Sequence, residues 1–147
     1  MSKDIRLAAM NLLARREHSQ QELHRKLLNK GFEAADIKPD LDRLSSEGLL
    51  SDERFTEAFI NSRLKRGSGP IKIAMELQQR GISDELVNAY LDERDAQWME
   101  SAHAVRIKRF GPSPPSDFKE RARQMRFLQY RGFTMEQIQR AVGEEID

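Results

Sequence analysis

Apolar residues recur four positions apart in the middle of the chain, where Ile73 and Leu77 share one face of a predicted helix. Charged residues take another face at the same spacing, namely Lys72, Glu76 and Arg80. Pro70 suits the first helical position because its φ is fixed and no partner awaits its missing N–H there. Gly81 can follow the last turn in a left-handed conformation without Cβ strain. The pattern predicts a short amphipathic helix that begins at Pro70 and stops before Gly81.

This pattern occurs three times, at offsets of 50 and 51 residues, when the chain is aligned on Gly31, Gly81 and Gly132. The columns that then match are Leu27, Leu77 and Leu128; Lys30, Arg80 and Arg131; Phe32, Ile82 and Phe133; and Ile37, Val87 and Ile138. A repeat of about this length is typical of stacked supersecondary units, each too small to bury its own apolar face. The alternative is a common helix-glycine-helix corner that matches by chance, but four columns in three copies favour a true repeat.

The repeat predicts three units, covering residues 1–50, 51–94 and 95–147. Each unit carries three helical patterns, and no segment reads convincingly as a strand. We therefore predict an all-α protein of nine helices, built as three tandem three-helix units that resemble helix-turn-helix motifs. The expected arrangement is an elongated, curved array with a narrow core.

In the first unit, a helix is predicted over residues 3–16. Ser19 and Glu22 form an S-x-x-E capping box that starts the second helix. Pro39 lacks an N–H, so the third helix is predicted to begin near Lys38, with Pro39 in its first turn.

In the other two units, capping residues and apolar spacing mark the remaining helices. The predicted starts are Ser51, Ser83, Asp95, Ser116 or Asp117, and Thr134, the last paired with Gln137 in a T-x-x-Q box. The side chains expected inside are Phe55, Phe59, Ile60, Val87, Tyr90, Leu91, Trp98, Ala102, His103, Val105, Phe118, Ala122, Met125, Leu128, Ile138 and Val142. Residues 111–115 contain three prolines and are expected to form an extended connector.

The amino-acid composition indicates how compact the protein is and in which compartment it is found. The 147 residues are 38% hydrophobic and 33% charged, which is thin for one compact globule and suits an array with much solvated surface. The chain has no cysteine, as is compatible with a reducing compartment. No apolar run approaches a membrane span and no signal-peptide pattern is present at the N-terminus. We expect a cytoplasmic protein, without membrane association and monomeric.

Charge alternates along the chain although the net charge is only +1. The segments 1–31, 32–60, 61–81, 82–100, 101–133 and 134–147 carry +4, −5, +4, −5, +6 and −3 respectively. If the units stack in one orientation, basic segments could align as a stripe that steers charged partners. The two signs could equally well neutralise each other between adjacent helices, and the sequence leaves both interpretations open.

No catalytic or metal-binding constellation is found in the sequence. His18, His24 and His103 share no metal-ligand spacing. The glycine-containing segment 67–69 precedes a helix, but it lacks the lysine-serine pair of a phosphate-binding loop. Acidic pairs such as Asp52 and Glu53 are explained by the helix dipole. We therefore predict no enzymatic activity, no catalytic residues, no metal and no cofactor.

Residues 121–133 form the most suggestive basic segment, because arginines alternate there with Phe127 and Tyr130. Such a mixture suits a protein interface anchored by Arg and Tyr, or phosphate contacts combined with base stacking. Phe127 is also a candidate for the core, and burial of Tyr130 is undecided at this point.

Four blocks in this order resemble the bacterial regulatory protein family RecX. They are Ser19-Gln-Gln-Glu22-Leu23-His-Arg25-Lys26-Leu27 with Lys30-Gly31-Phe32; Gly48-Leu-Leu-Ser-Asp52-Glu53-Arg54-Phe55; Gly69-Pro70-Ile-Lys72-Ile-Ala-Met-Glu76-Leu77 with Gly81-Ile82; and Arg126-Phe127-Leu128-Gln-Tyr130-Arg131-Gly132-Phe133. The resemblance spans nearly the whole chain and implies three three-helix repeats without catalytic activity. It also implies binding to the RecA recombinase, chiefly as the filament on single-stranded DNA. RecX proteins usually depress ATP hydrolysis, strand exchange and self-cleavage of the SOS repressor. Pro39 and the short N-terminal lead depart from the family pattern.

We place the predicted docking surface on basic residues chosen by sign and expected exposure, together with one tyrosine. These residues are Arg15, Arg16, Arg25, Lys26, Arg63, Lys65, Arg66, Lys72, Arg106, Lys108, Arg109, Arg123, Arg126, Tyr130 and Arg131. Contacts to several RecA subunits at once would act together through a high effective concentration. The alternative is a nucleic-acid-binding helical module that acts directly on DNA, and weak direct DNA binding is compatible with either hypothesis. An adaptor for another ATPase is a third possibility.

Overall fold

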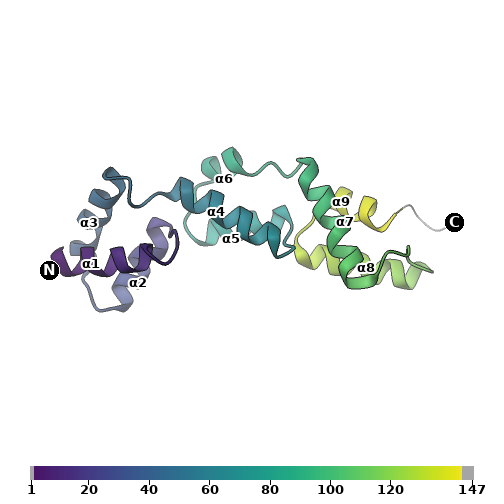
Figure 1. The fold of residues 1–147 in the computed structure, drawn as a ribbon, viewed down its shortest axis with the longest axis horizontal. Coiled ribbons are helices and arrows are strands. Elements are labelled where there is room, and N and C mark those ends of the chain that lie inside the picture. The colour runs from purple at the N-terminus through teal and green to yellow at the C-terminus, as the bar shows by residue number, and fades with distance from the viewer. Residues whose placement is uncertain (1, 144–147) are drawn as a thin grey trace. The chain divides into compact units, whose positions relative to one another are not determined.

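The computed structural model describes residues 2–143 of the chain, and in these residues the fold is entirely helical (Figure 1). The nine helices are α1 (Ser2–Leu13), α2 (Gln20–Asn29), α3 (Ala34–Ser46), α4 (Asp52–Lys65), α5 (Pro70–Gln79), α6 (Asp84–Tyr90), α7 (Ala96–Phe110), α8 (Phe118–Arg131) and α9 (Met135–Val142). The all-α prediction is confirmed. The last four residues of the predicted third unit, 144–147, lie outside the described part of the chain.

The three predicted glycine corners have one hydrogen-bonded geometry. Gly31, Gly81 and Gly132 have φ angles of +100°, +82° and +98°. After each glycine, the next N–H donates to the leucine carbonyl five residues earlier: Phe32 to Leu27 (3.3 Å), Ile82 to Leu77 (3.1 Å) and Phe133 to Leu128 (3.3 Å). All three leucines are fully buried. This is the Schellman motif, in which a left-handed residue lets the helix satisfy its last carbonyls, and its threefold occurrence confirms the repeat.

The capping predictions agree with the observed helix starts. Ser19 with Glu22, and Thr134 with Gln137, form complete capping boxes, and Asp117 accepts the N–H of Glu120 at 2.8 Å. The hydroxyl groups of two further serines accept N–H groups in the first turns of α4 and α6: Ser51 from Arg54 and Ser83 from Leu86, both at 3.1 Å.

The chain divides into two compact bodies. The N-terminal body contains the described residues of Met1–Phe59 together with Leu77–Tyr90, and the C-terminal body contains Ile60–Glu76 with the described residues of Leu91–Asp147. The boundaries fall within α4 and within α5, so the middle repeat contributes residues to both bodies.

Each body has an apolar core made by three packed helices. In the N-terminal body, α1, α2 and α3 enclose Ile5, Ala9, Leu23, Leu27, Ile37, Leu41, Leu44 and Leu50. In the C-terminal body, α7, α8 and α9 enclose Ala102, Leu128, Phe133, Ile138, Ala141 and Val142. Trp98 of α7 is also fully buried, and its indole N–H donates to the Asp92 carbonyl at 2.9 Å.

Within each body, the start of one helix meets the end of a helix from the next repeat. In the C-terminal body, the N–H groups of Gly69 and Ile71 donate to the carbonyls of Arg131 and Gly132, at 2.7 and 2.9 Å. In the N-terminal body, side chains make the corresponding bonds: the Ser19 hydroxyl to the Arg80 carbonyl (2.7 Å) and the Gln21 amide to the Gln79 carbonyl (3.3 Å). Carbonyls at a helix end, which lack partners inside the helix, are satisfied in this way.

The predicted position of Pro39 is wrong. Helix α3 begins at Ala34, so Pro39 lies in its second turn rather than its first. Ile37, which precedes the proline, is fully buried, and Leu41 and Leu44 bury the same side of the helix. The proline removes the bond to the carbonyl of Ala35, but that residue is exposed and water can solvate its carbonyl. Burial of the apolar face therefore outweighs the lost hydrogen bond.

Three predicted inward side chains are exposed instead. Tyr90 is 40% exposed and Phe118 is 63% exposed, and His103 also lies on the surface. Tyr90 is the last residue of α6 and Phe118 the first of α8. Both have the expected apolar spacing, but they lie at helix ends, where the flanking turns leave them uncovered.

Candidate functional site

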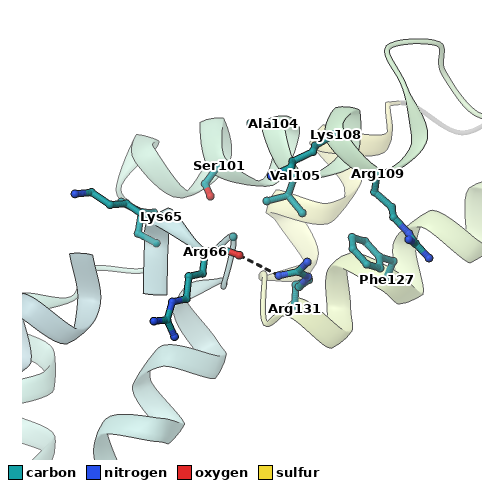
Figure 2. A pocket seen from close by; sticks show the side chains of 11 residues that line it. Lys65, Arg66, Ser101, Ala104, Val105, Lys108, Arg109, Phe127 and Arg131 are labelled. Atoms are coloured by element: carbon teal, nitrogen blue, oxygen red, sulfur yellow. Dashed lines mark hydrogen bonds between the residues drawn. The ribbon is translucent and has the colours of Figure 1, made fainter. Parts of the chain in front are cut away.

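A basic groove of about 440 Å³ lies in the C-terminal body (Figure 2). Five of the predicted docking residues line this groove, namely Lys65, Arg66, Lys108, Arg109 and Arg131. Its remaining lining is small or apolar and consists of Leu64, Gly67, Ser101, Ala104, Val105 and Phe127. No carboxylate is among the lining residues, so the groove has an uncompensated positive lining.

Local sequence explains why cations meet here. Lys65 is the last residue of α4 and Arg66 follows it, Lys108 and Arg109 lie in the last turn of α7, and Arg131 is the last residue of α8. Cations at helix C-termini are stabilised by the negative end of the helix dipole. Three helix ends therefore converge on one groove, each with a charge that its own helix favours.

An aromatic ring organises the arginines of the groove. The guanidinium carbons of Arg109 and Arg131 lie 5.4 and 5.2 Å from the centre of the Phe127 ring, within the range of cation–π attraction. Arg131 is also held by a 3.1 Å hydrogen bond to the Arg66 carbonyl (Figure 2). The exposed side chains of Lys65, Arg66 and Lys108 form no ion pair with any carboxylate in residues 2–143. These three cations are free to meet a ligand.

The other candidates in the C-terminal body have different surroundings. The ammonium group of Lys72 lies 5.1 Å from the centre of the Tyr130 ring, and Arg126 is exposed. Two candidates are in ion pairs: Arg63 with Glu76 at 3.5 Å and Arg123 with Glu120 at 3.1 Å. These two arginines are partly neutralised by partners within the fold.

The expected exposure of Arg106 is wrong. Its side chain is only 4% exposed, and its guanidinium donates to the Ser113 carbonyl at 3.2 Å and to the Gln124 side chain at 3.4 Å. Arg106 therefore ties the 111–115 connector to α7 and α8, and it is not available as a surface contact. The reason is geometric, since Arg106 follows Ala102 by one turn on the buried face of α7.

The four candidates of the N-terminal body do not form a comparable site. Arg15 and Arg25 are exposed, whereas Arg16 pairs with Glu22 at 3.2 Å. Lys26 points its ammonium group at the buried His18, 2.9 Å from Nε2. Burial lowers the pKa of Lys26, and the nearby Arg16 charge lowers it further.

Glu22 is the electrostatic centre of this region. Burial alone would raise the pKa of its carboxyl, but hydrogen bonds from Arg16 and from the Ser19 N–H together lower it. Arg80 adds a second guanidinium at 3.6 Å from the Glu22 carboxylate. The charged Glu22 thus holds the start of α2 against the end of α5.

Neither a metal site nor a membrane span is found in the described part of the chain. No group of three or more His, Asp or Glu side chains there is arranged to hold a metal ion. Among the helices described, none combines the length and the apolar character needed to cross a membrane.

Sequence reasoning missed the groove as a site, although it named the five cations that line it. Lys65 and Lys108 are 43 positions apart in sequence, and nothing in their spacing shows that their helices end side by side. The sequence did contain one usable signal, because a pair of adjacent basic residues lies at the C-terminal end of both α4 and α7. The role of Phe127 beneath two arginines gives no signal in the sequence.

The helical architecture and the groove define an all-helical repeat protein with a cationic groove on its C-terminal body. Family models match its three units in turn: the first three-helix domain of RecX at residues 6–44, the second at 51–91 and the third at 95–142. The chain belongs to the RecX family.

Similar proteins agree with this membership. Regulatory protein RecX of Halorhodospira halophila is 46% identical over 142 residues, covering 97% of this chain and 88% of that protein. The RecX of Pseudomonas putida strain GB-1 is 46% identical over 144 residues, covering 97% and 92%. The crystal structure of RecX from Lactobacillus salivarius superposes with a TM-score of 0.80 at 18% identity, covering 96% of this chain and 94% of that one. At that identity the structural likeness shows the fold.

Proposed function

We propose that this chain is a non-enzymatic negative modulator of the RecA recombinase. It binds the RecA filament on single-stranded DNA in the cytoplasm and depresses ATP hydrolysis, strand exchange and SOS coprotease activity. The observation that carries the proposal is the basic groove, which presents five cations without a carboxylate in a chain whose relatives are named regulatory proteins. No catalytic group is needed for this role, because inhibition requires only binding.

The groove is the first docking element of this proposal. Its free cations, Lys65, Arg66 and Lys108, suit the negatively charged surface of a nucleoprotein filament. The exposed Arg15 and Arg25 of the N-terminal body supply further contacts. Contacts at several RecA subunits would combine through effective concentration, so each one can be weak.

The test is RecA ATP hydrolysis on single-stranded DNA, measured with substoichiometric amounts of this protein. A Lys65→Ala/Arg66→Ala/Lys108→Ala variant should lose at least tenfold in inhibitory potency while keeping its helical content. The matched control is Lys38→Ala/Lys119→Ala/Arg140→Ala, which removes the same charge from exposed positions outside the groove. Equal potency of both variants would refute the groove, and no inhibition by the wild-type protein would refute the function.

A second candidate function is direct binding of single-stranded nucleic acid. The juxtaposition of Phe127 and Tyr130 with unpaired cations favours it, since stacking platforms beside basic grooves are typical of such proteins. The salt dependence of DNA binding distinguishes the two functions. Tight binding to a bare oligonucleotide that falls steeply with salt concentration would favour the nucleic-acid module, because each phosphate contact releases a counterion. Weak binding to bare DNA with strong binding to the filament would favour the RecA modulator.

A further inference from the structure

A second exposed surface of the C-terminal body is apolar rather than basic. It consists of Ile71, Met75 and Tyr130, which are 50%, 51% and 78% exposed, and we call these three residues the apolar patch. Isolated exposed apolar residues are ordinary on a protein surface. Large apolar side chains that are grouped on one surface call for an explanation.

Three observations place these side chains together. The Ile71 N–H donates to the Gly132 carbonyl at 2.9 Å, which fixes the first turn of α5 against the end of α8. Tyr130 lies two residues before Gly132, and the Lys72 ammonium group lies 5.1 Å from its ring centre. Met75 follows Ile71 by one helical turn on the same face of α5.

The fold does not depend on the patch for its core. In α5 the inward position is Ile73, and in α8 it is Leu128, and both are fully buried. Tyr130 is the most exposed of the large hydrophobic side chains in the described residues, yet the Lys72 ammonium group lies over its ring. Tyrosine and methionine are among the residue types enriched where proteins bind one another.

The charges around the apolar patch indicate which kind of partner surface would be complementary to it. Lys72 and the exposed Arg126, one turn before Tyr130 on α8, give the patch a cationic edge. The carboxylates of the same two helices are already engaged, Glu76 by Arg63 at 3.5 Å and Glu120 by Arg123 at 3.1 Å. A complementary surface must therefore offer an apolar pocket edged by carboxylates.

We propose that the apolar patch is a protein-docking surface that places Tyr130 and Met75 in an apolar pocket with acidic edges on a folded partner. That this partner is a RecA protomer in the filament rests on the proposed function. The patch and the groove then make different contributions to the affinity for the partner. The patch buries apolar surface, which salt does not weaken, whereas the groove supplies charge contacts that salt screens.

The test compares a Met75→Ala/Tyr130→Ala variant with the wild-type protein for binding to RecA filaments assembled on a single-stranded oligonucleotide. The matched control is Phe118→Ala, because Phe118 is 63% exposed in the same body but lies at the opposite end of α8. Filament affinity should fall at least tenfold for the patch variant and stay unchanged for the control. Binding of the control to the bare oligonucleotide should equal that of the wild-type protein. An equal loss of affinity of the patch variant for the filament and for the bare oligonucleotide would show that the patch contacts nucleic acid, and would overturn the inference.

The loss should persist at high salt, where the contribution of the groove has faded. Unfolding followed by Trp98 fluorescence checks that each variant is folded. Wild-type filament affinity in the patch variant would overturn this inference and leave the proposed function intact. Absence of wild-type binding to the filament would overturn both. Self-association of the wild-type protein in sedimentation that the patch variant abolishes would show that a second copy occupies the patch, and would also overturn the inference.

Discussion

The N–H of Gly69 donates a hydrogen bond of 2.7 Å to the carbonyl oxygen of Arg131. Together with the bond from Ile71 to Gly132, it lets the first turn of α5 satisfy carbonyls at the end of α8. The two backbones come so close that a methyl group on Gly132 would overlap the Cβ of Lys72. The positive end of one helix dipole thereby meets the negative end of another, and the basic groove is built beside this junction.

A Gly132→Ala substitution should destabilise the C-terminal body more than Gly31→Ala destabilises the N-terminal body. The two glycines have nearly equal φ angles, +98° and +100°, so each substitution carries a left-handed strain of about 1–2 kcal/mol. Only Gly132 faces a neighbouring helix, since a Cβ on Gly31 would meet nothing within 4 Å. The overlap should add about 1–3 kcal/mol. Urea unfolding of both variants, followed by circular dichroism and Trp98 fluorescence, measures the difference, and equal losses would contradict the close approach.

A Ser19→Ala substitution should cost more stability than Ser83→Ala, although both serines cap helices of the N-terminal body. Each hydroxyl accepts a first-turn N–H at 3.1 Å, a cap that contributes about 1 kcal/mol. Ser19 alone also donates to the Arg80 carbonyl at 2.7 Å, and it is fully buried. Losing this second bond leaves a carbonyl without a partner and should cost about 1–3 kcal/mol more. Thermal and urea unfolding of the two variants provide the comparison; a Ser19 variant as stable as the Ser83 variant would argue against a structural role for the Arg80 contact.

The repeat could be predicted because its key positions accept few residue types. A helix that must end in a left-handed residue favours glycine, and a position enclosed by three helices favours leucine, so Gly81 and Leu77 mark their column in each copy. The junctions could not be predicted in the same way. At Gly69 and Ile71 the main chain makes the bonds, so their side chains do not identify the partner. A Cβ at position 69 would overlap the backbone of Gly132 and Phe133, but a glycine in a loop does not show which backbone approaches it.

The sequence identified the cations that line the candidate site but not their arrangement in space. Sign and helix position identify Lys65 and Lys108 as surface cations, but only packing brings their helix ends to one groove. Arg106 shows the opposite case, since its charge suggested exposure while its spacing from Ala102 places it inside. A charged residue on the apolar face of a helix is better interpreted by its face than by its charge.

An Arg106→Ala substitution should strongly destabilise the C-terminal body, and Arg106→Met should do so less. The alanine leaves a cavity and removes the donor that faces Gln124 and the Ser113 carbonyl, for a loss of about 2–5 kcal/mol. Methionine refills most of the volume with a flexible apolar chain. Chemical denaturation with Trp98 fluorescence gives both values. Wild-type stability of the alanine variant would show that Arg106 does not hold the connector against α7 and α8.

Acid should weaken the N-terminal body through His18, which is buried between Arg16 and Lys26. Its Nδ1 lies 3.0 Å from the Arg16 carbonyl, and since a carbonyl only accepts, Nδ1 carries the proton. Nε2 is then the acceptor for the Lys26 ammonium group at 2.9 Å. A second proton on the ring would put two cations face to face. The pKa of His18 is lowered from 6.5, chiefly by burial and also by the charges of Arg16 and Lys26. The Arg16 carbonyl and the Glu22 carboxylate raise this pKa, but they do not offset the lowering.

The sign of the pH dependence follows from this lowered pKa. As the pH falls past 6.5, the His18 ring becomes protonated in the unfolded chain but stays neutral in the folded protein. The free energy of unfolding is therefore retained at pH values above 6.5 and falls as the pH drops below 6.5. The slope can reach about 1.4 kcal/mol per pH unit. Urea unfolding of the wild-type protein from pH 7.5 to pH 5 should show this loss, His18→Gln should remove it, and His103→Gln, at an exposed position of the other body, should keep it. A His18→Gln variant with the wild-type slope would assign the pH dependence to other groups, because the Glu22 carboxyl, with its lowered pKa, titrates below this range.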